Sequence, residues 1–251
     1  MLQQRNKPVL VFMSALICLA MNLKSEAIIN IEDQRKEGEI GLFNSISASL
    51  DASRGNRDRD NYSLSYRLDN NTETIDSFII YSQSERKYEG TVKDESNFFH
   101  ARLVLKNSSD LHYEVFAQVS ENPFRNYKNR EVIGGGLRWL LNDHARLGIS
   151  LIQEDEEGLD GTQTKTDRMN IYFHDDYEID ENITFNTTLY FQPSLDEYED
   201  DYKASIIFAF DFLINQNLEI TLQYSRFNDS MPPVNSDKMD EGISTKFTYN
   251  F

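Results

Sequence analysis

The amino-acid sequence predicts an all-β protein, a closed antiparallel transmembrane β-barrel of about twelve strands that follows an N-terminal signal peptide. Three observations predict this class. Apolar and polar residues alternate along most of the chain, the segments between the alternating stretches are long and short in turn, and the chain closes on an aromatic residue, Phe251. Alternation with period two places successive side chains on opposite faces of a strand, as the wall of a barrel requires.

The N-terminus has the three-part layout of a secretory signal peptide. A short basic start precedes an apolar run from Val9 to Ala20, and Ser25-Glu26-Ala27 supplies the small residues of a cleavage site. The apolar run is too short to span a bilayer comfortably, which disfavours a retained anchor helix. The expected organisation is a signal peptide that is removed (1–27), a periplasmic N-terminal segment (28–37) and an outer-membrane barrel (38–251).

The composition is acidic and nearly free of cysteine. The formal net charge is −17, and the only cysteine, Cys18, lies in the predicted signal peptide. Loss of residues 1–27 removes three basic residues and one acid, which leaves 22 Lys+Arg against 41 Asp+Glu and a net charge of −19. Because phosphate binding needs a basic surface, this composition argues against nucleic acid as a partner. An exported chain without cysteine depends on its backbone ladder and its core rather than on disulfides.

Twelve stretches of alternation follow one another after the N-terminal segment, and no stretch carries a helical period over several turns. The parity of the third stretch is ambiguous, because Phe78, Ile79, Ile80 and Tyr81 are consecutive. The expected strands are centred on residues 40–50, 62–68, 75–83, 99–105, 111–119, 133–141, 145–151, 169–173, 183–191, 202–212, 218–224 and 243–251.

The connections between these stretches favour a membrane barrel over a soluble one. Long polar segments such as SERKYEGTVKDE (84–95) and EDEEGLDGTQTK (154–165) take turns with short ones such as ND. Bacterial outer-membrane barrels have long external loops and short periplasmic turns, and they are closed because an open strand edge cannot be satisfied in lipid. A soluble sandwich or a lipocalin-like barrel remains the alternative, since alternation alone does not say which face points inward.

One stretch carries a resemblance to a known family. Phe116–Trp139 reads FAQVSENPFRNYKNREVIGGGLRW, Gly55-Asn56 follows the first predicted strand, and Arg102 lies at the centre of FFHARL. These features resemble the YdiY-like family of salt-induced outer-membrane proteins, a domain-of-unknown-function family. The resemblance implies an outer-membrane barrel, and it supplies no catalytic residues. The matching positions within the stretch are Phe116, Gln118, Phe124, Arg130, Gly134, Gly136 and Arg138.

The polar faces of the strands predict a charged lumen. If the KNSSD turn centres near Ser108, Arg102 lies across from Glu114, with Arg138 diagonally placed on the next strand. Buried charges need partners, and opposed cross-strand pairs stabilise a ladder. We therefore expect a network of these three residues in a largely filled lumen, with a narrow channel for small anionic solutes as the alternative. The basic residues predicted to face inward are Arg67, Arg102, Lys106, Arg138, Arg146, Arg168, Lys203 and Lys246, against the acids Glu114, Asp211 and Glu219.

The sequence offers no catalytic residues and no cofactor site. The histidines His100, His112 and His174 are expected inside and His144 in a turn, and the familiar hydrolase and phosphate-loop motifs are missing. The expected role is therefore structural or related to envelope and salt stress, without catalysis, and an outer-membrane hydrolase is the second alternative. Two acidic stretches expected in external loops, residues 154–160 and 196–201, are candidates for divalent cations that bridge lipopolysaccharide, or else are simply solvated.

The C-terminal strand has aromatic residues on one face, Phe247, Tyr249 and Phe251. They resemble the terminal signal that the outer-membrane assembly machinery recognises, and an interfacial aromatic belt is a compatible interpretation. The expected location is thus the bacterial outer membrane. The expected partners are its lipid, its lipopolysaccharide and its assembly machinery.

Overall fold

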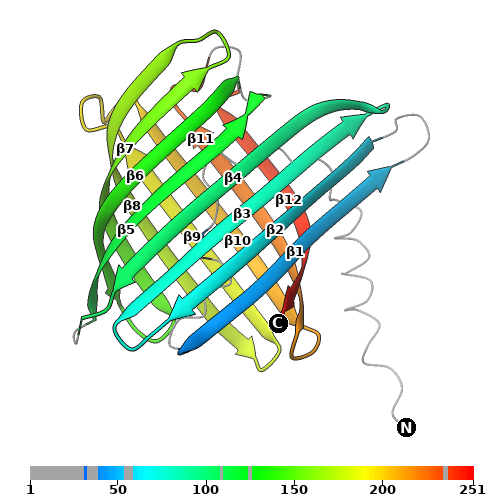
Figure 1. Cartoon of the computed structure of the whole chain (residues 1–251), viewed down its shortest axis with the longest axis vertical. Coiled ribbons are helices and arrows are strands. Elements are labelled where there is room, and N and C mark those ends of the chain that lie inside the picture. Colours follow the sequence, from blue (N-terminus) through cyan, green and yellow to red (C-terminus); the bar gives the residue numbers. More distant parts are fainter. Residues whose placement is uncertain (1–30, 33–38, 54–58, 108–109, 124–125, 234–236) are drawn as a thin grey trace.

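The computed structural model describes residues 31–32, 39–53, 59–107, 110–123, 126–233 and 237–251, and the predicted signal peptide lies outside these residues. The described residues form twelve antiparallel strands that close into one barrel, in which each strand pairs with its sequence neighbours and β12 pairs with β1 (Figure 1). The predicted fold class is therefore confirmed. No helix among the described residues is long and apolar enough to cross a membrane.

The strands have the following bounds: β1 Gly41–Ser53, β2 Arg59–Asn71, β3 Ile75–Tyr88, β4 Thr91–Leu105, β5 Leu111–Asn122, β6 Tyr127–Leu140, β7 Ala145–Gly158, β8 Gln163–Asp180, β9 Ile183–Pro193, β10 Tyr202–Leu213, β11 Leu218–Asp229 and β12 Met239–Asn250.

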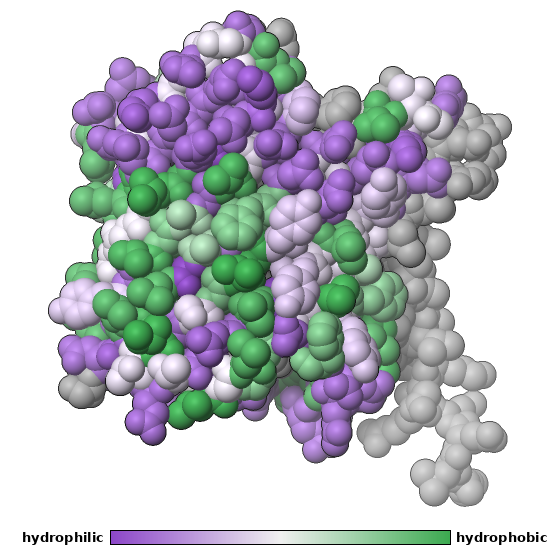
Figure 2. All heavy atoms as spheres, in the orientation of Figure 1, coloured by the Kyte–Doolittle hydropathy of each residue, from purple (hydrophilic) through white to green (hydrophobic). Residues whose placement is uncertain are grey.

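The two faces of the wall separate as the alternation predicts. Leu64, Val115 and Leu151 are exposed on the outer surface, which carries an apolar band below a broad hydrophilic cap (Figure 2). The cap lies at the end of the barrel where β3 joins β4 and β7 joins β8. Such a band flanked by polar rims is the outer surface of a barrel that crosses a bilayer.

The structure resolves the parity of β3. Phe78 and Ile80 are buried inside the barrel, and Ile79 and Tyr81 are exposed on the outside. Four consecutive apolar residues arise here because the interior of the barrel is itself apolar at this point, so both faces of β3 carry apolar side chains.

Two of the long external loops expected from the sequence, residues 84–95 and 154–165, are largely strand. β3 and β4 continue their ladder to Tyr88 and Thr91 and are joined by Glu89-Gly90, whose φ angles of 49° and 73° suit a two-residue hairpin turn. β7 likewise continues to Gly158. Charged residues are compatible with a ladder that projects beyond the membrane, so a polar composition was a poor guide to where the strands end.

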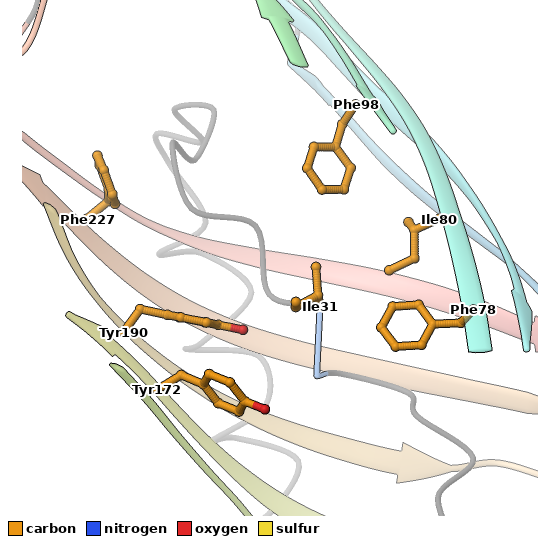
Figure 3. Close-up of a cluster of buried hydrophobic side chains, with 7 residues drawn as sticks. All are labelled: Ile31, Phe78, Ile80, Phe98, Tyr172, Tyr190 and Phe227. Carbon is orange, nitrogen blue, oxygen red and sulfur yellow. The ribbon is translucent and has the colours of Figure 1, made fainter. Parts of the chain in front are cut away.

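Two residues of the predicted periplasmic segment 28–37 are described, and both lie inside the barrel. Ile31 is 5% exposed and Glu32 is 2% exposed. Ile31 lies between apolar side chains from opposite sides of the wall (Figure 3). This insertion was not predicted, because a short polar segment before the first strand has the composition of a linker.

The barrel closes over a short seam. Ser45–Ala48 of β1 pair with Phe247–Asn250 of β12, whereas β1 and β2 pair along the whole of Gly41–Ser53. Inside the seam, the hydroxyl oxygens of Ser47 and Thr248 lie 2.9 Å apart in a hydrogen bond. The register at the seam is thus fixed near the end of the barrel that holds the C-terminus.

Candidate functional site: the charged lumen

The lumen contains a buried group of charged side chains that we call the Glu32 cluster, made of Glu32, Arg102, Glu114, Arg138 and Tyr172. Arg102 Nη1 donates to Glu32 Oε1 at 3.2 Å and to Glu114 Oε2 at 2.9 Å. Arg138 Nη1 donates to Glu32 Oε2 at 2.7 Å and to the Tyr172 hydroxyl at 2.8 Å. That hydroxyl donates in turn to Glu114 Oε2 at 3.0 Å. Two guanidinium groups and two carboxylates balance in charge.

The structure brings together the three residues that the sequence placed in one network, with a different register. Phe116 is the register partner of Arg102, and Val104 is the partner of Glu114, so Arg102 and Glu114 are diagonal neighbours rather than opposite ones. The pairing therefore differs by two residues from the one that a turn centred at Ser108 would give. Contact survives the shift because an arginine side chain spans the diagonal of an antiparallel pair.

Glycines in the wall make room for two aromatic rings, that of Tyr172 in the cluster and that of Phe116 beside it. Tyr172 pairs with Gly148, and a Cβ at Gly148 would lie 1.9 Å from the ring of Tyr172. Phe116 pairs with Gly134, where a Cβ would lie 2.6 Å from the Phe116 ring. An aromatic ring laid over a cross-strand glycine restores the packing that the glycine lacks. The Arg102 guanidinium then lies 4.5 Å from the centre of the Phe116 ring.

Ile31 and Glu32 are also held by apolar packing and by a hydrogen bond to the backbone of Ile31. Figure 3 shows Ile31 between two groups of side chains, one from β3 and β4 and the other from β8, β9 and β11. Arg67 Nη1 donates to the Ile31 carbonyl at 3.2 Å, while the same guanidinium pairs with Asp69 at 2.8 Å. The apolar neighbours of Ile31 are Phe78, Ile80, Phe98, Tyr172, Tyr190 and Phe227.

A second buried group, which we call the Glu154 cluster, lies toward the hydrophilic cap. Lys203 Nζ donates to Glu154 Oε1 at 2.7 Å, Arg130 Nε donates to Glu154 Oε2 at 2.8 Å, and Arg168 Nε lies 3.5 Å from Glu154 Oε1. Arg168 also forms a two-pronged contact with Asp201, at 2.9 and 3.0 Å. The cluster consists of Arg130, Glu154, Arg168, Asp201 and Lys203.

This cluster corrects the interpretation of Glu154. The acidic run 154–160 predicted that Glu154 lies in an external loop, as a candidate ligand of divalent cations. It is instead 4% exposed inside the barrel, where three basic side chains compensate its charge. The strand parity of β7 could have revealed this, because Arg146, Ser150 and Glu154 lie on the same face.

The remaining acidic residues of the two candidate loops do not form a metal site in the described part of the chain, where no group of three possible ligands converges. Asp201 is engaged by Arg168. In the β7–β8 connection the backbone N–H of Thr162 donates to Asp160 Oδ1 at 2.9 Å, and this hydrogen bond lowers the pKa of the Asp160 carboxyl. Among the described residues, the acidic side chains of the two candidate loops therefore do not assemble a coordination geometry for a cation.

The space between the two clusters is small. A cavity of about 40 Å³ is bordered by Arg102 from one cluster and Arg130 from the other, with Gln118, Asn170 and Gln192 between them. Such a volume holds a few water molecules at most. The side chains that border this cavity therefore leave little open space beside them.

The aromatic residues of the C-terminal strand lie on the outside of the barrel. Phe247, Tyr249 and Phe251 are all exposed, and the rings of Tyr249 and Phe251 stack with their centres 6.2 Å apart. The N–H of Phe251 donates to the carbonyl of Asn44 at 3.0 Å, so the last residue still follows β1.

The closed wall, the outward apolar band and the charged lumen define an outer-membrane β-barrel, a fold shared with porins and channels. The translocator domain of the autotransporter NalP from Neisseria meningitidis is similar over 97% of this chain and 95% of that chain, with a TM-score of 0.55 and 8% identity. The NanC porin is similar over 83% and 98%, with a TM-score of 0.51 and 10% identity. The KdgM porin is similar over 84% and 99%, with a TM-score of 0.50 and 9% identity. At such identities the likeness concerns the fold alone.

A family model identifies the family to which the chain belongs. The family described as "Protein of unknown function, DUF481" matches residues 46–251, and the protein belongs to it. No curated protein matches the sequence well enough to count as a relative.

Proposed function

We propose that the protein is a non-catalytic structural barrel of the bacterial outer membrane, exported by its signal peptide, whose lumen is closed by its own side chains. The observation that carries the proposal is the Glu32 cluster. The side chains of Glu32, Glu114 and Arg138 are each 0% exposed, and that of Arg102 is 1% exposed. An aqueous pore would leave such charged groups hydrated.

Conductance in planar lipid bilayers tests this proposal. The refolded protein should insert without producing discrete current steps, while a porin such as KdgM in the same membrane serves as a positive control. Anion-preferring steps that disappear in Arg102→Ala or Arg138→Ala would contradict the filled lumen and favour the channel described next.

A narrow channel for small anionic solutes is the second candidate. Its support is the number of basic side chains in the lumen, and a ring of such groups selects anions. The KdgM porin, similar in fold, was solved in complex with disordered oligogalacturonate, which is a polyanion. In this barrel the basic groups are neutralised by nearby acids, which is why the closed form is preferred. The basic residues on the inner wall are Arg67, Arg102, Arg130, Arg138, Arg146, Arg168 and Lys203.

The environment of the histidines supports a role without catalysis over the hydrolase alternative. His100 stacks with Phe78, Phe98 and Phe116, at ring-centre distances of 5.7, 6.2 and 5.9 Å. His174 Nδ1 forms a hydrogen bond with Thr188 Oγ1 at 2.8 Å. These contacts are those of packing residues. Hydrolysis of a chromogenic ester or peptide by the refolded barrel would contradict the proposal.

The C-terminal aromatic residues are proposed to address the chain to the outer-membrane assembly machinery. Phe251 is 60% exposed, so its side chain contributes little buried area to the fold. Deletion of Phe251 should therefore reduce the amount of barrel assembled in the membrane several-fold, while refolding in detergent changes little. Heat-modifiable migration on gels measures both. An equal loss in the two measurements would instead assign Phe251 a purely structural role.

The resemblance to salt-induced outer-membrane proteins leads us to propose a role in envelope or salt stress, with lipid, lipopolysaccharide and divalent cations at the cap as partners. The acidic character of the chain supports the cation partner. A rise in protein level after a salt upshift, and a growth defect of the deletion strain at high salt, are the expected results. Unchanged protein levels and growth would contradict this role.

A further inference from the structure

The outer surface of the barrel has a hollow of about 560 Å³ that extends over β2 to β6, and we call it the alanine hollow. Ile79, Val115 and Ile133 line it and are exposed, so the hollow opens to the outside of the wall and not into the lumen. β2, β3 and β4 cross the front of Figure 1, and the apolar band of Figure 2 lies on the same face. The hollow is therefore part of the surface that the fold presents to lipid.

Two small side chains on neighbouring strands make the hollow. Ala101 of β4 and Ala117 of β5 are register partners and share the outer face. In the same row across the wall, Ile79 follows on one side of this pair and Ile133 on the other. Neighbouring strands lie about 4.8 Å apart, so two adjacent methyl groups form a floor between higher walls. The other apolar side chains on the outer side of the hollow are Leu68, Leu103 and Val115.

One end of the hollow is polar. Asn70 and Ser77 line it near the turn that joins β2 to β3, at the end of the barrel opposite the hydrophilic cap. The Ser77 hydroxyl donates to the Asn70 carbonyl at 3.0 Å. The Asn70 side chain is exposed, and its amide makes no hydrogen bond within the part of the chain that the structure describes. This amide is thus available to a polar group outside the protein.

We propose that the alanine hollow holds one acyl chain of a phospholipid whose head group lies at Asn70, in the leaflet at the end of the barrel opposite the cap. The inference rests on the membrane location proposed above, and it adds a specific lipid site to that location.

The shape of the hollow favours a lipid chain over a protein partner. The wall of a barrel is convex, so a second copy of the chain would touch the rim of the hollow and leave its floor empty. A hydrocarbon chain is narrow and flexible, and it can follow the floor between the isoleucines. Within lipid, apolar groups associate through close packing, and an empty hollow would forfeit those dispersion contacts.

The polar end sets the direction of the lipid. The Asn70 amide has both donors and an acceptor, and the ester and phosphate oxygens of a phospholipid accept hydrogen bonds. Lipopolysaccharide would carry its head group toward the cap. The outward-facing polar residues of the hollow, Asn70 and Ser77, are both at the other end.

Native mass spectrometry of the full chain, extracted from membranes in a mild detergent, tests the site. The wild-type barrel should retain a single phospholipid. Ala117→Phe fills the floor of the hollow, and the occupancy should then fall about tenfold, which corresponds to about 1.4 kcal/mol of lost packing. Asn70→Leu keeps the hollow and removes the amide, and it should lower the occupancy by a smaller factor.

A matched substitution elsewhere on the wall controls for the added ring. Ala204 lies on β10 between Lys203 and Ser205, which are buried inside, so its side chain is on the outer face and outside the hollow. Ala204→Phe should retain phospholipid as the wild type does. Heat-modifiable migration on gels verifies that each variant is assembled, and Ala101→Phe replaces Ala117→Phe if the latter does not assemble.

Three outcomes would overturn the proposal: equal occupancy in wild type and Ala117→Phe, lipopolysaccharide retained in place of phospholipid, or a wild-type dimer that Ala117→Phe converts to a monomer. The third would assign the hollow to a second copy of the chain. An assembled wild-type barrel without phospholipid would contradict the lipid site alone. A chain that never enters membranes would contradict the proposed membrane location as well.

Discussion

The Glu154 and Glu32 clusters both bury a charged glutamate inside the barrel, but they hold it in different ways. In both, a glutamate is buried inside the barrel and its two oxygens are shared among basic side chains from different strands. Glu154 is part of β7 and is fixed by ladders on both sides, to Val132 of β6 and Thr166 of β8. Glu32 is carried by a segment outside the sheet.

The difference lies in how each glutamate is tied to the wall of the barrel. Breaking a buried ion pair by removing one partner is costly because the other charge stays buried. In the Glu154 cluster every partner is fixed to the wall, so its charges have no route back to water. In the Glu32 cluster the glutamate itself belongs to none of the twelve strands. We therefore expect the Glu154 cluster to be the more rigid of the two.

Glu154→Gln should give the largest effect. The amide leaves Arg130, Arg168 and Lys203 without their shared charge, and the expected loss is about 3–5 kcal/mol in the free energy of unfolding. Urea unfolding in lipid vesicles, followed through Trp139 fluorescence, measures it. The control Glu157→Gln removes a half-buried charge of the same strand that pairs with the exposed Lys128, and it should cost less than about 1 kcal/mol.

Glu32→Gln should give a smaller loss in the same experiment, about 1–3 kcal/mol, which is the range for a lost hydrogen bond to a charged group. Glu32 is not held by a strand ladder, so we expect the structure around it to adjust to the amide more easily than the wall around Glu154 does. A loss as large as that of Glu154→Gln would contradict this expectation.

Much of the barrel could be predicted because lipid imposes a simple rule on its outer face. Leu64, Val115 and Leu151 must be apolar, and their alternation with polar residues marks strand and parity together. The rule fails where lipid is not the solvent. Phe78 and Ile80 are apolar and point inward, toward Ile31, and the strands that project beyond the membrane have polar residues on both faces.

The site was predictable only where it belongs to the wall. Arg102, Glu114 and Arg138 share the inward face of neighbouring strands, and that is enough to group them even with a register error of two residues. Glu32 could not be found in this way, since periodicity describes strands and Glu32 is in none. Glu154 was missed because a run of acids looks like a loop until its basic partners, distant in sequence, are known.

Tyr172→Phe should give the smallest loss in the free energy of unfolding. Its combination with changes in either cluster tests whether the two clusters are energetically independent. Tyr172 is the neutral member of the Glu32 cluster, accepting from Arg138 at 2.8 Å and donating to Glu114 at 3.0 Å. Removing the hydroxyl leaves the charges balanced and breaks two hydrogen bonds, so we expect a loss of about 1–2 kcal/mol in the urea experiment. Tyr177→Phe, on the exposed face of the same strand, should change the stability by less than about 0.5 kcal/mol.

Double variants show which glutamate Tyr172 acts with. In the double variant with Glu32→Gln, the loss from Tyr172→Phe should shrink, because Arg138 has then already lost its ion pair with Glu32. Combined with Glu154→Gln, the same loss should be additive, since the two clusters have no member in common. Additivity with both glutamates would mean that Tyr172 stabilises the wall alone and has no part in holding Glu32.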